Sequence, residues 1–262
     1  MKNIITKTLT VAAVGAVMAL SMGQAMAAPT PVAGVIVGGP GETTFKFSDL
    51  TENFVGAIGD SLFGYGRVNQ INGLNEDTFC ANGGGCELTY TFSDYSLAGF
   101  KPTGALSAAV FTGGAINFYL DDTPDSNLST ISGFTDGTSW LSLVGLEITE
   151  TFGPNAGQTG TLFTNGTAFN NPDLIKGFGV GNLRITGGAA GSYFGIDNIA
   201  TLSSSFQPSP TGWSLPLSGT AELQVTAGVL PPTEVPEPAT LALLGAGLLG
   251  LGAATRSRKQ RG

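Results

Sequence analysis

The chain has 262 residues, with 40 Gly, two Cys and no His, and only 11% of its residues are charged. Without His it can form neither a Ser-His-Asp nor a Cys-His nucleophile pair, and no imidazole can bind zinc, copper or haem iron. Carboxylates, Tyr, Lys or a hard cation held by oxygens remain for catalysis, but we expect no enzymatic activity. The many Gly and few charges favour a loop-rich β protein over a helical one.

The first 27 residues have the parts of a secretory signal peptide. Lys2 and Lys7 supply a positive start, an apolar run follows from Val11 to Leu20, and Ala25-Met26-Ala27 is an A-x-A cleavage sequence. We expect signal peptidase to remove this segment, so that the mature chain begins at Ala28. The alternative is an N-terminal membrane anchor, for which the apolar run is short.

Several segments of the middle region alternate apolar and polar residues with a period of two. In one of them Leu88, Tyr90 and Phe92 share a face. Turn sequences such as Asn72-Gly73 separate the segments. The alternating segments are residues 45–47, 87–93, 116–120, 182–186 and 221–226. We therefore expect an all-β ectodomain over residues 28–227, an antiparallel β-sandwich of jelly-roll type.

Both cysteines, Cys80 and Cys86, flank a short Gly-rich run. The glycines give the backbone the freedom that a tight ring needs, and an exported chain meets oxidising conditions. We therefore expect a Cys80–Cys86 disulfide. A redox-active pair is the alternative, but the C-x-x-C spacing that is typical of such pairs is absent.

An acidic stretch follows the predicted strand that ends near Leu120. It contains Asp121, Asp122 and Asp125, and calcium takes oxygen ligands in loops of this kind. We consider these three carboxylates a candidate calcium site, and we expect no other cofactor. The EF-hand pattern is missing, and the alternative is a solvated acidic turn.

Two aromatic residues are candidates for stacking on sugar rings. Tyr193 and Trp213 lie among Gly, Ser and Pro residues, and such side chains combine a flat apolar area with a polar tip. They favour a secreted carbohydrate-binding module as an alternative function. A glycan hydrolase is the weakest alternative, because nothing in the sequence places two carboxyls across a scissile bond.

The charge of the mature body limits its partners. From Ala28 to Val235 there are five Lys and Arg against 18 Asp and Glu, a net charge of −13. Nucleic-acid phosphates need basic partners, so we expect no nucleic acid to bind. An anionic lipid surface would also repel this body.

The C-terminal part has three segments in order. Residues 228–238 form a Pro-rich stalk that ends in Val235-Pro236-Glu237-Pro238. Residues 239–255 form a hydrophobic segment that we predict to be a single transmembrane helix, and residues 256–262 form a basic tail. The positive-inside rule keeps this tail in the cytoplasm, so the body lies outside.

This order of segments resembles the PEP-CTERM sorting signal of exported proteins in Gram-negative bacteria, over Val235–Gly262. The resemblance implies recognition by exosortase, with cleavage near the Pro-Glu-Pro sequence. It also implies anchoring in the inner membrane before processing, and then the cell surface or the extracellular space. Because such proteins occur in bacteria that make exopolysaccharide, biofilm or flocs, it implies a structural or adhesive role with exopolysaccharide as a partner.

Overall fold

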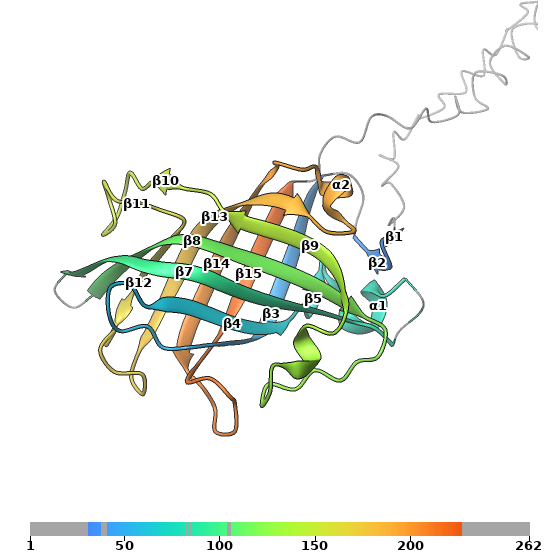
Figure 1. Ribbon diagram of the computed structural model, residues 1–262, viewed down its shortest axis with the longest axis horizontal. Coiled ribbons are helices and arrows are strands. Elements are labelled where there is room, and N and C mark those ends of the chain that lie inside the picture. The colour runs from blue at the N-terminus through green and yellow to red at the C-terminus, as the bar shows by residue number, and fades with distance from the viewer. Residues whose placement is uncertain (1–30, 38–40, 82, 84, 104–105, 227–262) are drawn as a thin grey trace, which may run out of the picture.

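The computed structural model describes residues 31–37, 41–81, 83, 85–103 and 106–226 (Figure 1). The predicted signal peptide with Ala25, Ala27 and Ala28 lies outside these residues. The predicted stalk with Val235–Pro238, the predicted C-terminal helix and the basic tail also lie outside them. The stalk, the helix and the signal peptide therefore stay predictions.

Most of the described chain forms β-strands. The strands are β1 (Pro31–Val32), β2 (Val35–Ile36), β3 (Glu42–Glu52), β4 (Ser61–Arg67), β5 (Gln70–Ile71), β6 (Leu74–Asn75), β7 (Glu87–Thr103), β8 (Leu106–Asp121), β9 (Thr138–Gly145), β10 (Ile148–Thr149), β11 (Thr159–Gly160), β12 (Leu162–Thr167), β13 (Lys176–Gly187), β14 (Ile199–Pro208) and β15 (Leu217–Thr226). The helical turns are α1 (Glu76–Phe79), η1 (Ser132–Phe134) and α2 (Gly191–Phe194).

Eight strand positions form one barrel-like sheet in which neighbouring strands are antiparallel (Figure 1). The strands follow one another around the sheet in chain order as β3, β4, β7, β8, β12, β13, β14 and β15. β15 then pairs with β3, from Leu217 opposite Glu52 to Thr226 opposite Glu42. This last pairing closes the circuit, so that none of the eight strands lies at an open edge.

The all-β prediction is confirmed, but the strands do not form the predicted sandwich or jelly roll. A sandwich needs two sheets, and a jelly roll needs Greek-key connections. The long strands instead belong to one sheet and pair with their neighbours in the chain. The period-two pattern is the same in both architectures, because each buries one face of every strand.

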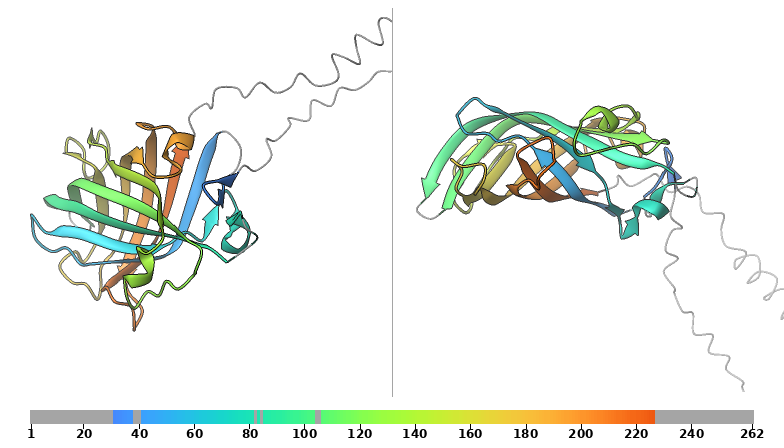
Figure 2. Two further views of the ribbon diagram at one scale, coloured as in Figure 1. Left: turned by 45° about the vertical axis from the view of Figure 1, so that its right-hand side comes forward. Right: turned by 90° about the horizontal axis from the view of Figure 1, so that it is seen from below.

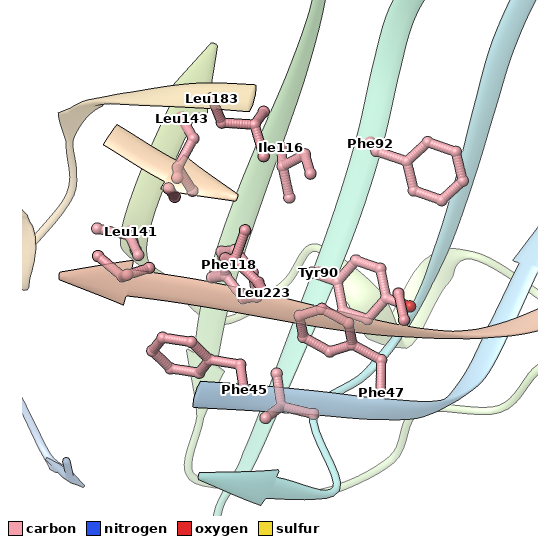
Figure 3. Packing of buried hydrophobic residues seen from close by; sticks show 14 of the residues in the cluster. Phe45, Phe47, Tyr90, Phe92, Ile116, Phe118, Leu141, Leu143, Leu183 and Leu223 are labelled. Atoms are coloured by element: carbon pink, nitrogen blue, oxygen red, sulfur yellow. The ribbon is translucent and has the colours of Figure 1, made fainter. Parts of the chain in front are cut away.

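The main hydrophobic core fills the interior of this sheet. Leu88, Tyr90 and Phe92, which the alternation places on one face, are at most 8% exposed. The ring of Phe45 lies 5.9 Å from that of Phe118, and Figure 3 shows aromatic rings from β3, β7 and β8 converging. Each such aromatic pair stabilises the fold by about 0.5–1.5 kcal/mol beyond the area that it buries.

Two glycines of β4 make room for two of these rings. Gly64 pairs with Phe92 and Gly66 with Tyr90 across the β4–β7 ladder. A Cβ at either glycine would collide with the opposite ring and with a backbone carbonyl of β3. The glycines therefore let the rings of Phe92 and Tyr90 lie over the neighbouring strand.

One position of the sheet is shared by two strands. β9 and β12 both pair with β8 and with β13, at different heights along them. Between them, Leu146–Thr161 leaves the sheet and forms the small β10–β11 hairpin, which lies apart from the strand wall in Figure 1. Asn182 of β13 closes the gap, because its backbone bonds both Leu146 and Thr161.

A long loop covers part of the outer surface. Between β8 and β9, the chain passes over β4 and β7 and carries η1. Phe134 of η1 places its ring 4.6 Å from that of Tyr65, and its carbonyl accepts a hydrogen bond from the Thr89 hydroxyl at 3.0 Å. Outward-facing residues at the start of β7 are therefore buried, and this matters for Glu87 below.

Candidate functional site

A cavity of about 110 Å³ lies at the end of the sheet where β3 ends and β4 begins. A second space of about 40 Å³ lies deeper, beside Tyr90. Glu52, Leu62, Leu162 and Ser204 border both spaces, so the two belong to one interior region. Most side chains around this region are apolar, and Glu52 is its one carboxyl among the residues that the structure describes.

A β-bulge decides which way Glu52 points. Phe47 of β3 pairs with Ala221 of β15, and Leu50 pairs with Gly219. Between these two pairs β3 has two residues, whereas β15 has only Thr220. An extra residue reverses the alternation of faces along a strand. Phe47 faces the interior, and a regular strand would therefore place Leu50 and Glu52 outside. Because of the extra residue, Leu50 and Glu52 also face the interior.

The Glu52 carboxyl makes no hydrogen bond or ion pair with any residue that the structure describes. It keeps some exposure at the cavity. Burial raises the pKa of Glu52 from 4.5 to about 8, because the charged form loses its hydration. At neutral pH the carboxyl is therefore mainly protonated and can donate a hydrogen bond.

Tyr90 borders the deeper space and carries a second unpaired polar group. Tyr90 is 3% exposed, and its hydroxyl has no hydrogen-bond partner among the described residues. Burial raises the pKa of Tyr90 well above 10, and the nearby charges of Glu52 and Asp49 add to this. A buried hydroxyl without a partner costs about 1–3 kcal/mol, so the interior has an unmet need for a polar partner.

An open groove of about 810 Å³ lies on the outer surface beside β3, β14 and β15. Its lining is rich in hydroxyl and amide side chains; Ser205 and Thr220 bond to each other there at 2.9 Å. In Figure 2, α1 and the short strands before it project from the sheet next to β3. This projection forms the second side of the groove, with Asn69, Gln70 and Asn75.

The groove carries one cation, Lys46, and three carboxylates, Glu76, Asp77 and Glu222, within the described part of the chain. Burial is the largest effect on Glu76 and raises its pKa; the nearby Arg67 lowers the pKa by a smaller amount. The groove is therefore negatively charged overall, and it favours neutral or cationic ligands over anionic ones.

An acidic cluster lies under the loop that follows β8. Glu87, Asp121 and Asp125 bring one carboxylate oxygen each to within 4.8 Å of one another. Glu87 is 1% exposed and accepts hydrogen bonds from the backbone N–H groups of Asp125 at 3.1 Å and Ser126 at 3.0 Å. The Ser126 hydroxyl also donates to Glu87, and Oδ2 of Asp121 is buried without a partner among the described residues.

The structure thus brings together two of the three residues predicted to bind calcium. Asp121 and Asp125 lie in the cluster, whereas Asp122 is exposed and does not belong to it. Glu87 takes the third place. Three carboxylates suit calcium, but the bonds to Glu87 also hold the loop without any ion, so calcium binding stays a prediction.

The predicted disulfide between Cys80 and Cys86 is present, with a Cα–Cα distance of 5.9 Å. Both cysteines are buried, at 2% and 8% exposure. Cys80 follows α1 and forms a β-bridge with Val35. The bond therefore fixes the end of α1 and the start of β7, which begins at Glu87, next to Cys86.

The two aromatic residues predicted to stack on sugars lie at opposite ends of β14. Tyr193 is in α2, just before this strand; its ring lies 5.1 Å from that of Phe194, and burial raises its pKa. Trp213 lies in the loop after β14 and is partly exposed. A strand of ten residues separates them by about 30 Å, so they form no common platform.

Three residues of these sites are not among the site residues predicted from the sequence: Glu52, Tyr90 and Glu87. The alternation predicts that Tyr90 is buried, but it does not show that the hydroxyl lacks a partner. Glu87 directly follows Cys86, so the predicted disulfide is the signal that could place this acid beside a constrained loop. No local pattern marks the bulge that turns Glu52 inward.

Comparison with known proteins finds a match only for the C-terminal part of the chain. The model of the PEP-CTERM protein-sorting motif matches residues 234–259. The chain carries a PEP-CTERM sorting motif. This confirms the resemblance found in the sequence, while no curated protein and no solved structure matches the chain.

The PEP-CTERM motif indicates how the protein is exported and sorted. It indicates an exported protein that exosortase recognises and processes, and that is sorted to the cell surface. Within the part of the chain that the structure describes, no helix has the length and apolar character needed to cross a membrane. The predicted membrane helix, residues 239–255, lies outside that part.

Proposed function

We propose that this PEP-CTERM protein is a structural or adhesive component of an exopolysaccharide matrix. In this proposal the outer groove beside β3, β14 and β15 binds the polysaccharide. The observation that carries the proposal is a groove of about 810 Å³ with a lining of hydroxyl and amide side chains, on a protein that is exported to the surface.

The lining of the groove suits sugar hydroxyls. Hydroxyl side chains such as Ser203, Ser205 and Thr220 donate and accept, and the amides of Asn69 and Asn75 offer donor and acceptor side by side. The excess of carboxylates in the groove disfavours acidic polysaccharides. We therefore assign a neutral polysaccharide, or one with amino sugars, as the ligand.

A binding assay on the host's own exopolysaccharide tests this proposal. The processed protein should be retained on immobilised exopolysaccharide, and Ser205→Tyr, which fills the groove, should weaken retention by about tenfold or more, or about 1.4 kcal/mol. Thr186→Tyr is the matched control, because Thr186 is an exposed hydroxyl residue on β13, away from the groove. Equal retention of both variants would contradict the groove assignment.

The same assay separates the alternatives. If Trp213→Ala or Tyr193→Ala abolishes retention while Ser205→Tyr does not, the aromatic residues bind the sugar and the groove does not. We propose binding without hydrolysis, so the amount of reducing ends in the polysaccharide should not rise during incubation. A rise that Glu76→Gln or Glu222→Gln removes would show a hydrolase instead.

A further inference from the structure

We propose that the interior region of the barrel-like sheet binds a small hydrophobic amine. In the bound state the ammonium group contacts Glu52 and Tyr90, and the apolar part lies in the cavity at the end of the sheet. This site is separate from the outer groove and does not depend on polysaccharide binding.

The polar end of the site has two groups without partners. Glu52 borders both spaces, and no described residue gives its carboxyl a hydrogen bond or an ion pair. The Tyr90 hydroxyl is buried, borders the deeper space and has no partner among the described residues. Folded proteins rarely leave two such groups unpaired in one apolar interior, so these groups indicate a missing polar partner.

The apolar end of the site sets the size of the ligand. Apolar side chains border the cavity of about 110 Å³, among them Leu62, Leu97, Phe111, Leu162 and Leu217. Thr164 also borders it, with an Oγ1 that has no partner among the described residues. An apolar cavity of about 150 Å³ holds a benzene-sized molecule. The cavity and the deeper space together therefore suit an aliphatic chain or a ring of about six carbons, and not a long acyl chain.

The charges around the site select an amine over an acid. No described Lys or Arg borders either space, and the titratable side chains that do are Glu52, Tyr90 and Tyr95. A ligand carboxylate would meet Glu52 without a cation between them, which is unfavourable at low dielectric. An ammonium group instead donates to the Glu52 carboxylate and to the Tyr90 oxygen, and the acidic body attracts cations.

Three probes with the same chain length test the assignment: hexylamine, hexan-1-ol and hexanoate. We expect calorimetry on the exported protein at pH 7 to show hexylamine binding at least about tenfold more tightly than hexan-1-ol, and no binding of hexanoate. The Glu52 carboxyl is mainly protonated at pH 7 in the protein without ligand, and it is ionised when it contacts the ammonium group. Hexylamine binding should therefore also release a proton. The enthalpy measured in buffers of different ionisation enthalpy reports this release.

Two variants separate a loss of binding at the site from a loss of folding. Glu52→Gln keeps the size of the side chain and removes the charge, so it should abolish both the preference for hexylamine and the proton release while hexan-1-ol still binds. Ala109→Leu, which fills part of the cavity, should weaken the binding of every probe. Thermal unfolding of each variant checks that it is folded.

Each result has a defined consequence. Equal affinities of the wild type for hexylamine and hexan-1-ol would overturn the amine assignment, and so would hexylamine binding that survives unchanged in Glu52→Gln. If no probe binds to the wild type, the interior is not a binding site. None of these results bears on the outer groove, whose variants are tested on polysaccharide.

Discussion

At the scale of single residues, the ionisation of Glu52 opposes folding. Its pKa is about 8 in the folded protein against a reference value of 4.5. Between these values the folded state holds a proton that the unfolded state has released, so stability falls as the pH rises. The slope from this one group is at most about 1.4 kcal/mol per pH unit, and below the reference pKa the group contributes no slope.

We expect Glu52→Gln to remove this slope. The variant should match the wild type near pH 4, below the reference pKa, and be more stable than the wild type at pH 8 by about 2 kcal/mol or more. Urea unfolding at the two pH values measures the difference. Glu42→Gln, at the exposed start of the same strand, is the control and should follow the wild type. A Glu52→Gln variant less stable than the wild type at pH 8 would show that the carboxylate has a partner.

The sequence predicts the buried faces of single strands well, but only within an unbroken register. Leu88, Tyr90 and Phe92 alternate without interruption and are buried as predicted. In β3 the alternation through Phe45 and Phe47 would place Glu52 outside. The bulge opposite Thr220 depends on pairing with a strand far away in the chain, which a local pattern does not contain.

At the scale of elements, the shared position of β9 and β12 shows one strand interrupted by an insertion. Gly145 pairs with Leu183 and Leu162 pairs with Gly181, so one residue of β13, Asn182, lies between them. Leu146–Thr161 is therefore topologically dispensable. Leu146 and Thr161 bond to the sheet at the two ends of this segment. Between these ends, Asn155 is 1% exposed and donates from Nδ2 to the Thr164 carbonyl at 3.3 Å.

We expect the sheet to survive removal of this insertion. Replacing Leu146–Thr161 with a single Thr should leave the far-ultraviolet circular dichroism unchanged and lower the free energy of unfolding by about 1–3 kcal/mol, because the buried Asn155 hydrogen bond is lost while a shorter loop closes more easily. Asn155→Ala alone should account for most of that loss. Non-cooperative unfolding of the deletion variant would show that the insertion is needed to close the sheet.

Loops are harder to predict than strands in this chain. The sequence predicts an acidic stretch after a strand that ends near Leu120, and β8 ends at Asp121. Two of the three acids predicted there, Asp121 and Asp125, do meet. The third partner, Glu87, comes from a strand that the loop covers, and only the fold brings the two segments together. Tyr193 and Trp213 lie in segments of similar composition, so the sequence predicts a common role for them. The fold keeps them apart, because the length of β14 lies between them.

At the scale of the whole molecule, the C-terminal PEP-CTERM motif indicates the destination of the chain and the middle determines its shape. The PEP-CTERM motif is an ordered pattern of neighbouring residues, so the sequence alone is enough to identify it. The barrel-like sheet has no such pattern, because closure depends on the pairing of the first long strand, β3, with the last, β15. Alternation shows that a strand has a buried face, but not which strand lies beside it.

Processing gives a prediction about the whole chain. The exported protein should have lost residues 1–27 and the segment after the Pro-Glu-Pro sequence, and intact-mass spectrometry measures both losses. Glu237→Ala should leave the tail in place and keep the protein in the membrane fraction. Pro232→Ala, in the stalk but outside the motif, is the control and should be processed normally. A surface form that still contains Arg261 would refute removal of the tail.

The pairing of Glu42 with Thr226 has a consequence for orientation. Both residues lie at the end of the sheet opposite the interior cavity, which is bordered by Glu52 and Leu217 at the far ends of the same two strands. Thr226, the last residue that the structure describes, therefore lies about 30 Å from the cavity end of β15. An attachment made at Thr226 would therefore leave the cavity end of the sheet unobstructed.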